Sequence, residues 1–89
     1  MGEPNAPKIE FPCEYVIKVI GDSAPDFRDF VVTVVETHAP GLRETDISVT
    51  ESSRGRFSSV QLRIVATGEA QLKALFAELK ASGRVRMVL

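Results

Sequence analysis

An alternating run in the second half of the chain constrains the fold most. Between Ser58 and Ala66 every second residue is apolar, and a period of two is that of a β-strand with one buried face. A shorter alternating run at residues 47–50 precedes it across the polar turn at 51–56, so the two runs predict a β-hairpin. The apolar face of this hairpin needs a cover, which the rest of the chain must supply. That face carries Val60, Leu62, Ile64 and Ala66.

Two segments with helical spacing can supply this cover. Residues 24–38 and 68–81 each carry apolar side chains three and four positions apart, which predicts an amphipathic helix with one buried stripe. Ser23 and Thr67 stand before these segments as predicted N-caps. The first stripe holds Phe27, Phe30, Val31, Val34, Val35 and His38, and the second holds Leu72, Leu75, Phe76 and Leu79.

Two further apolar runs complete the pattern. Residues 15–20 are almost continuously apolar and predict a central strand, buried on both faces except at Lys18, and residues 84–89 predict a last strand. Right-handed crossovers place both helices on one side of the sheet. We therefore predict an α+β fold, a ferredoxin-like βαββαβ sandwich with a four-stranded antiparallel sheet and two helices on one face. This domain spans residues 11–89, after a flexible N-terminal tail at residues 1–10.

The other sheet face is expected to be open, and domains of this kind use such a face to dimerise or to bind a partner. Its candidate residues are Lys18, Ser59, Gln61, Arg63, Arg84 and Arg86.

Composition argues against several classes of function. The chain has 89 residues and a formal net charge of -1, so it fits one domain without a basic footprint for nucleic acid or a membrane surface. No run reaches the roughly 20 apolar residues that span a bilayer, and no signal peptide is apparent, so we expect a cytoplasmic location. Cys13 is the single cysteine and His38 the single histidine, so we expect no metal site and no cofactor.

Catalysis is not expected either. An acylphosphatase of this fold needs an arginine in the loop after the first strand, where residues 21–25 instead carry the carboxylate of Asp22. An RNA-recognition domain needs aromatic rings on its central strands, and Gln61 stands where such a residue belongs. No nucleophile–base pair is evident, so the sequence predicts a binding domain and not an enzyme.

Four short segments resemble the YbeD-like family of small bacterial proteins of unknown function. They are Glu10-Phe-Pro, His38-Ala-Pro-Gly41, Ser52-Ser-Arg-Gly55 and Val85-Arg-Met-Val-Leu89, and the resemblance covers residues 9–89. It implies a fold similar to the ACT regulatory domain, which binds amino acids or other small effectors at dimer interfaces. Members of the family are often encoded beside lipoate-attachment genes.

The resemblance leads to a first functional hypothesis. The chain would be a small regulatory or adaptor domain that binds an amino acid or a lipoate-related effector in the ACT manner, as a homodimer. Gly21 and Asp22 lie where the ACT effector loop lies, although Asp26 follows Pro25 where that loop usually has glycine. His38 is a candidate ligand contact, or else a cation that caps the first helix.

A second hypothesis is a protein–protein interaction module that docks through its open sheet face or its arginine-containing hairpin. The hairpin residues Ser52, Ser53, Arg54 and Gly55 offer hydroxyls and a guanidinium to a carboxylate or phosphate, or they form a solvated turn. Arg84 and Arg86 alternate with apolar residues. They either form salt bridges along the sheet or make a basic patch for an acidic partner.

Overall fold

The strands and helices follow one another in the predicted order. The structure is a computed structural model that describes residues 12–52 and 54–89, so the predicted tail at residues 1–10 lies outside the described residues. The elements are β1 (Cys13–Asp22), α1 (Phe27–His38), a single 3-10 turn η1 (Glu44–Asp46), β2 (Ile47–Glu51), β3 (Phe57–Ala66), α2 (Glu69–Ala81) and β4 (Val85–Val88).

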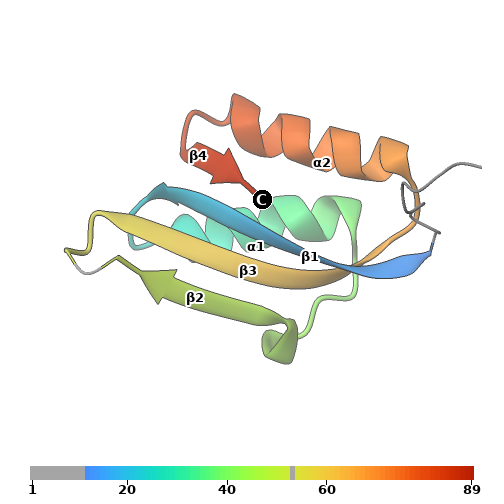
Figure 1. The fold of residues 1–89 in the computed structure, drawn as a ribbon, viewed down its shortest axis with the longest axis horizontal. Helices are drawn as coiled ribbons and strands as arrows, with labels where there is room; N and C mark the ends of the chain where they lie inside the picture. The colour runs from blue at the N-terminus through green and yellow to red at the C-terminus, as the bar shows by residue number, and fades with distance from the viewer. Residues whose placement is uncertain (1–11, 53) are drawn as a thin grey trace, which may run out of the picture.

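The strands form one antiparallel sheet in the order β2-β3-β1-β4, and both helices cover the same face of it (Figure 1). This confirms the predicted α+β fold. The central strands β1 and β3 pair from Cys13↔Ala66 to Asp22↔Phe57, whereas β2 and β4 are shorter edge strands. The buried rows of β1 and β3 meet both helix stripes in a single core. Its fully buried side chains are Ile17, Val19, Phe27, Val31, Val35, Val60, Leu62, Leu75 and Leu79.

The prediction that β1 is buried on both faces is wrong. Ile17 and Val19 are buried and Lys18 is exposed as predicted, but Val16, which precedes Ile17, is exposed as well. No layer covers the second face of the sheet in the described part of the chain, so the apolar character of this run does not mean burial. β1 also extends through Gly21 and Asp22, which the sequence assigned to the following loop.

Both predicted N-caps are wrong, and at Ser23 the reason is the longer β1. Because β1 continues to Asp22, Ser23 is held against β3, where its N–H donates to the carbonyl of Arg56 over 3.0 Å. Its hydroxyl lies 2.7 Å from that of Ser58, and the N-cap of α1 is Asp26, which makes no side-chain capping bond. At α2 the N-cap is Gly68 and not Thr67.

Gly21 allows β1, α1 and the segment before β4 to meet. A Cβ atom at this position would overlap the carbonyl oxygen of Arg84 and would lie 2.6 Å from the ring of Phe27. The residue is buried, so neither neighbour can move away without disturbing the core. The close approach of two other chain segments therefore requires glycine here.

We predict that Gly21→Ala destabilises the fold by about 1–3 kcal/mol, the usual cost of forcing an extra methyl group into a packed site. Urea unfolding followed by circular dichroism measures the change. Gly68→Ala is the matched control, because a Cβ there has no atom within 4 Å, and its cost should stay within about 1 kcal/mol. Equal losses for the two variants would contradict the packing argument.

Candidate functional site

The two arginines near the C-terminal strand form ion pairs with the two aspartates around the start of α1. Arg84 donates from both terminal nitrogens to Asp26, with Nη2–Oδ1 at 2.6 Å and Nη1–Oδ2 at 3.2 Å. Arg86 donates to Asp22 from Nη2 at 3.0 Å and from Nε at 3.2 Å. Of the two interpretations that the sequence left open, the structure shows salt bridges.

Arg84 and Arg86 do not share a face as their alternation suggested. Arg84 precedes β4, and its guanidinium lies 4.7 Å from the ring centroid of Phe30 on α1. Arg86 stands opposite a register shift between Ile20 and Gly21, where β4 has one residue more than β1. Such a bulge turns a side chain out of the regular alternation.

These contacts fix the charge state of the clamp formed by Asp22, Asp26, Arg84 and Arg86. The hydrogen bond from Arg84 lowers the pKa of the Asp26 carboxyl below its ordinary value. Hydrogen bonds to Asp26 and Asp22 raise the pKa of Arg84 and Arg86. Each guanidinium of the clamp thus lies against one carboxylate, so the clamp carries as many acidic as basic groups.

The segment predicted as an effector loop supplies the two aspartates of this clamp. Gly21 is buried, Asp22 belongs to β1 and holds Arg86, and Asp26 holds Arg84. Effector binding at Gly21 and Asp22 stays a prediction, and a ligand there would have to displace one of these pairs.

His38 connects the two helices. It is the last residue of α1, and its Nε2 lies 2.7 Å from Oε1 of Glu78 on α2. Its carbonyl accepts a hydrogen bond of 2.8 Å from the side-chain amide of Gln71. The position at a helix C-terminus agrees with the structural interpretation of this residue.

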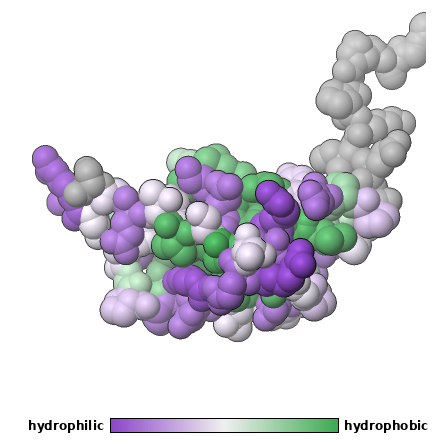
Figure 2. Space-filling view, turned by 90° about the horizontal axis from the view of Figure 1, so that it is seen from below, coloured by the Kyte–Doolittle hydropathy of each residue, from purple (hydrophilic) through white to green (hydrophobic). Residues whose placement is uncertain are grey.

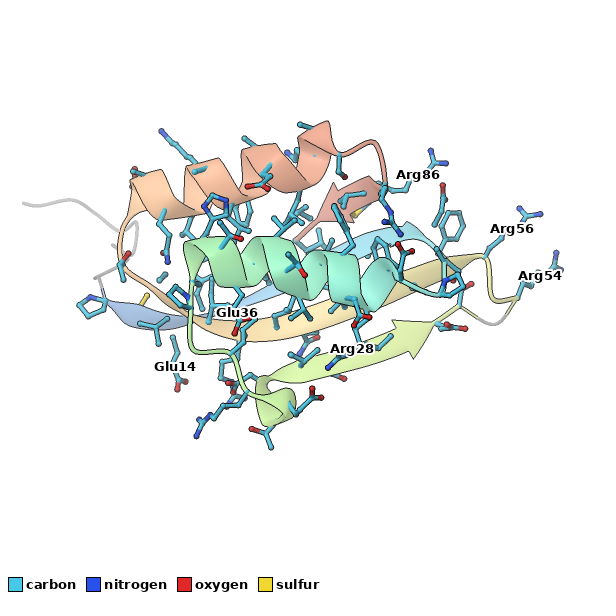
Figure 3. All side chains as sticks on the ribbon, turned by 180° about the vertical axis from the view of Figure 1, so that it is seen from behind. Glu14, Arg28, Glu36, Arg54, Arg56 and Arg86 are labelled. Atoms are coloured by element: carbon cyan, nitrogen blue, oxygen red, sulfur yellow. The ribbon has the colours of Figure 1, made fainter. Side chains whose placement is uncertain are left out.

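The hairpin between β2 and β3 is built by Ser52. Its hydroxyl accepts hydrogen bonds from the N–H groups of Arg56 and Phe57, at 3.1 and 3.2 Å, and Gly55 adopts a φ of +67°. Arg54 and Arg56 point away from the body of the protein (Figure 3) and form no ion pair with any described residue. Ser53 lies outside the described residues.

The open face is the sheet surface that no helix covers. Strand alternation and the pairing register identify its members, because partners in a pair share a face. Lys18, Ser59, Gln61 and Arg63 belong to it as the sequence predicted, whereas Arg84 does not. The face consists of Glu14, Val16, Lys18, Ile20 and Asp22 on β1, Ser48 and Thr50 on β2, Phe57, Ser59, Gln61, Arg63 and Val65 on β3, and Met87 and Leu89 at β4.

Most large apolar side chains that remain exposed in the described part of the chain lie on this face. Val49 is the exception, since it pairs with the buried Val60 and points to the helix side. Sequence analysis missed this group, because β1 looked buried on both faces. Seen from the β2 edge, hydrophobic patches alternate with hydrophilic ones (Figure 2). The exposed fractions are 49% for Val16, 57% for Val65, 50% for Met87, 63% for Leu89 and 39% for Phe57.

Two hollows of about 190 Å³ each lie near one end of the sheet, and both are bordered by Asp46 and Arg63. One opens on the open face beside Val16 and Gln61, and the other lies between β3 and residues 39–43. Both are smaller than the roughly 300–1,000 Å³ of typical organic ligand sites. They fit a side chain better than a cofactor.

The described residues contain no group of three or more His, Cys, Asp or Glu that could hold a metal ion. No helix in the same part of the chain is long and apolar enough to cross a membrane.

Comparison with solved structures defines the class of the fold, a small ACT-like α+β domain. The solution structure of HP0495 from Helicobacter pylori matches with a TM-score of 0.70 at 19% identity, over 100% of this chain and 98% of that one. The ACT domain of GTP pyrophosphokinase from Chlorobium tepidum matches with a TM-score of 0.65 at 15% identity, over 85% and 84%. These identities establish the fold alone.

The sequence then identifies the family. The model of the family described as "Protein of unknown function (DUF493)" matches residues 6–89, and the chain belongs to this family. A UPF0250 protein of Azotobacter vinelandii is 55% identical over 96% of this chain and 94% of its own length. Another from Hahella chejuensis is 44% identical over 98% and 96%. This membership is consistent with the YbeD-like resemblance.

We predict that the clamp makes the folding stability depend on pH in the acidic range. Since the folded-state pKa of Asp26 is lowered, its stabilising contribution is complete above the ordinary aspartate pKa of about 3.9 and is lost as the pH falls through the lower folded-state value. The urea midpoint of the wild type should therefore fall more steeply below about pH 4 than that of Asp26→Asn.

Glu36→Gln is the control for this measurement, because Glu36 is an exposed carboxylate on α1 that pairs with no described residue. Its pH profile should follow the wild type. Parallel profiles for the wild type and Asp26→Asn would show that the clamp does not act in solution.

Proposed function

We propose that the protein is a non-enzymatic adaptor domain that binds another protein through its open face. The observation that carries this proposal is the concentration of exposed large apolar side chains on that face. The solvent-exposed face of an antiparallel sheet normally carries polar residues. A group of large apolar side chains on such a face marks an interaction site.

The charges of the open face indicate the chemistry of the partner. Lys18 and Arg63 lie diagonally across β1 and β3 at the centre of the face, and neither pairs with a described carboxylate. Of the carboxylates on the face, Asp22 is already paired with Arg86, and Glu14 lies away from the centre, at the end of the sheet opposite the hairpin. A partner surface with acidic residues between apolar ones complements this arrangement.

A second copy of the chain fits this face less well. A two-fold contact brings the same patch of both subunits together, so the central cations would face their own copies. Such like-charge contacts oppose association. The partner that we propose is therefore a different, acidic protein.

The hollow beside Arg63 strengthens the assignment of this face. Interfaces concentrate binding energy where an anchor side chain enters a pocket near a charged or aromatic residue. The hollow lined by Val16, Gln61 and Arg63 offers such a position on the open face. The hairpin arginines Arg54 and Arg56, in contrast, project from a turn and line neither of these two hollows.

We predict that the double variant Lys18→Glu/Arg63→Glu loses its partner, whereas Lys73→Glu/Lys80→Glu keeps it. Both variants change the net charge by the same amount, but Lys73 and Lys80 are exposed on α2, on the other side of the molecule. The full chain is immobilised, proteins retained from a lysate of its own cell type are identified, and each is purified for affinity measurement. Charge reversal on the open face should weaken binding by at least about tenfold.

Three results would contradict the proposal. The two double variants could bind the partner equally, which would exclude the open face. Arg54→Ala/Arg56→Ala could abolish binding while the face variant keeps it, which would assign binding to the hairpin. Sedimentation could show a dimer that Val16→Asp and Val65→Asp dissociate, which would make the occupant a second copy.

A further inference from the structure

The edge of β1 is only half covered. β4 pairs with β1 at Val19, Ile20 and Gly21, and Lys18 exchanges both backbone hydrogen bonds with Leu89, at 3.0 and 2.9 Å. Before Lys18, residues 13–17 have no strand beside them on this side within the described part of the chain.

The direction of the backbone groups follows from this pairing. N–H and C=O groups of successive residues in a strand point to opposite edges. Because Lys18 points to β4, Val16 and Glu14 point to the same edge, whereas Tyr15 and Ile17 pair with Ile64 and Leu62 of β3. No backbone hydrogen bond joins the N–H or C=O of Glu14 or Val16 to a described residue.

The surroundings leave this edge accessible from the open face. α2 packs on α1, β3 and β4, with few contacts to β1. The side chains of Glu14 and Val16 are exposed, and Glu14 lies at the end of the sheet opposite the hairpin (Figure 3). The N–H and C=O groups of Glu14 and Val16 form a row of two donors and two acceptors along this edge. Such a row can pair with an added strand.

We propose that an extended segment of another protein adds to β1 at Glu14–Val16, antiparallel to it and in line with β4. Its residues opposite Glu14 and Val16 would each exchange two backbone hydrogen bonds, so neither can be proline. Glu14 favours a basic residue opposite it, and Val16 favours a β-branched or aromatic one. The inference uses backbone groups and does not require the acidic surface proposed for the open face, although Val16 borders both.

Hydrogen exchange of the free protein is the first test. The amide protons of Glu14 and Val16 should exchange at least about 100-fold faster than those of Tyr15 and Ile17, which belong to the β1–β3 ladder. Alternating protection of this kind would support the free edge. Equal protection of all four amides at every protein concentration would overturn it. Protection of Glu14 and Val16 that appears only at high concentration would make the occupant a second copy, and would also overturn the proposal.

Selection of random seven-residue peptides displayed on phage against the full chain is the second test. Selected peptides should lack proline at their central positions and carry a basic residue two positions from a β-branched or aromatic one. Adding a selected peptide should protect the amides of Glu14 and Val16. Failure to enrich any sequence, or protection elsewhere only, would overturn the proposal.

Glu14→Pro and Glu14→Ala separate backbone pairing from side-chain contacts. Proline removes one N–H donor from the free edge, where a strand tolerates it, so the peptide should bind about tenfold more weakly than to Glu14→Ala. A urea midpoint close to that of Glu14→Ala confirms that the proline variant folds. Equal affinity for the two folded variants would overturn the proposal. Lys18→Glu/Arg63→Glu should still bind the peptide, which keeps this inference separate from the open-face function.

Discussion

The pairing of β1 with β3 is the interaction on which the rest of the structure depends. Its ten residue pairs bring two apolar rows together, and these rows form the floor on which both helices rest. Neither edge strand has this role, since β2 and β4 are shorter and contain no fully buried residue. Loss of a helix would leave this floor exposed to water, and loss of the floor would leave both helices without a buried face.

The same pairing explains where binding surfaces arise. A two-layer sandwich covers one sheet face and leaves the other to solvent, so apolar residues on the second face add nothing to the core. Because β2 and β4 cover only parts of β3 and β1, the central ribbon also keeps an uncovered edge. The open face therefore results from the two-layer architecture, and the free edge of β1 results from the unequal lengths of the strands.

The sequence predicts most of the fold because the decisive signals are local. The alternation from Val60 to Ala66 and the stripe from Phe27 to Val35 each determine an element and its buried side. Prediction failed where two interpretations share one pattern. The run 15–20 is equally apolar whether one or both faces are buried, and only the position of the helices shows that Val16 is exposed.

Less of the candidate site could be predicted, because its contacts join distant parts of the chain. Arg84 was a candidate, but its partner Asp26 is 58 positions away, and nothing local indicates that the two meet. Ser23 was a suitable cap by sequence, yet a longer β1 carries it to Ser58. Lys18 and Arg63 were placed correctly, since strand alternation alone determines their face.

The clamp between Asp22, Asp26, Arg84 and Arg86 also bears on how the chain is made. Its pairs join residues 58 and 64 positions apart, so they close a loop that contains most of the domain. During synthesis β1 leaves the ribosome long before these arginines are added to the chain. It stays unpaired until β3 and then β4 have emerged. A nascent chain thus exposes both edges of β1 until β3 and β4 have been made, and the arginines complete the fold only when residues 84–86 emerge.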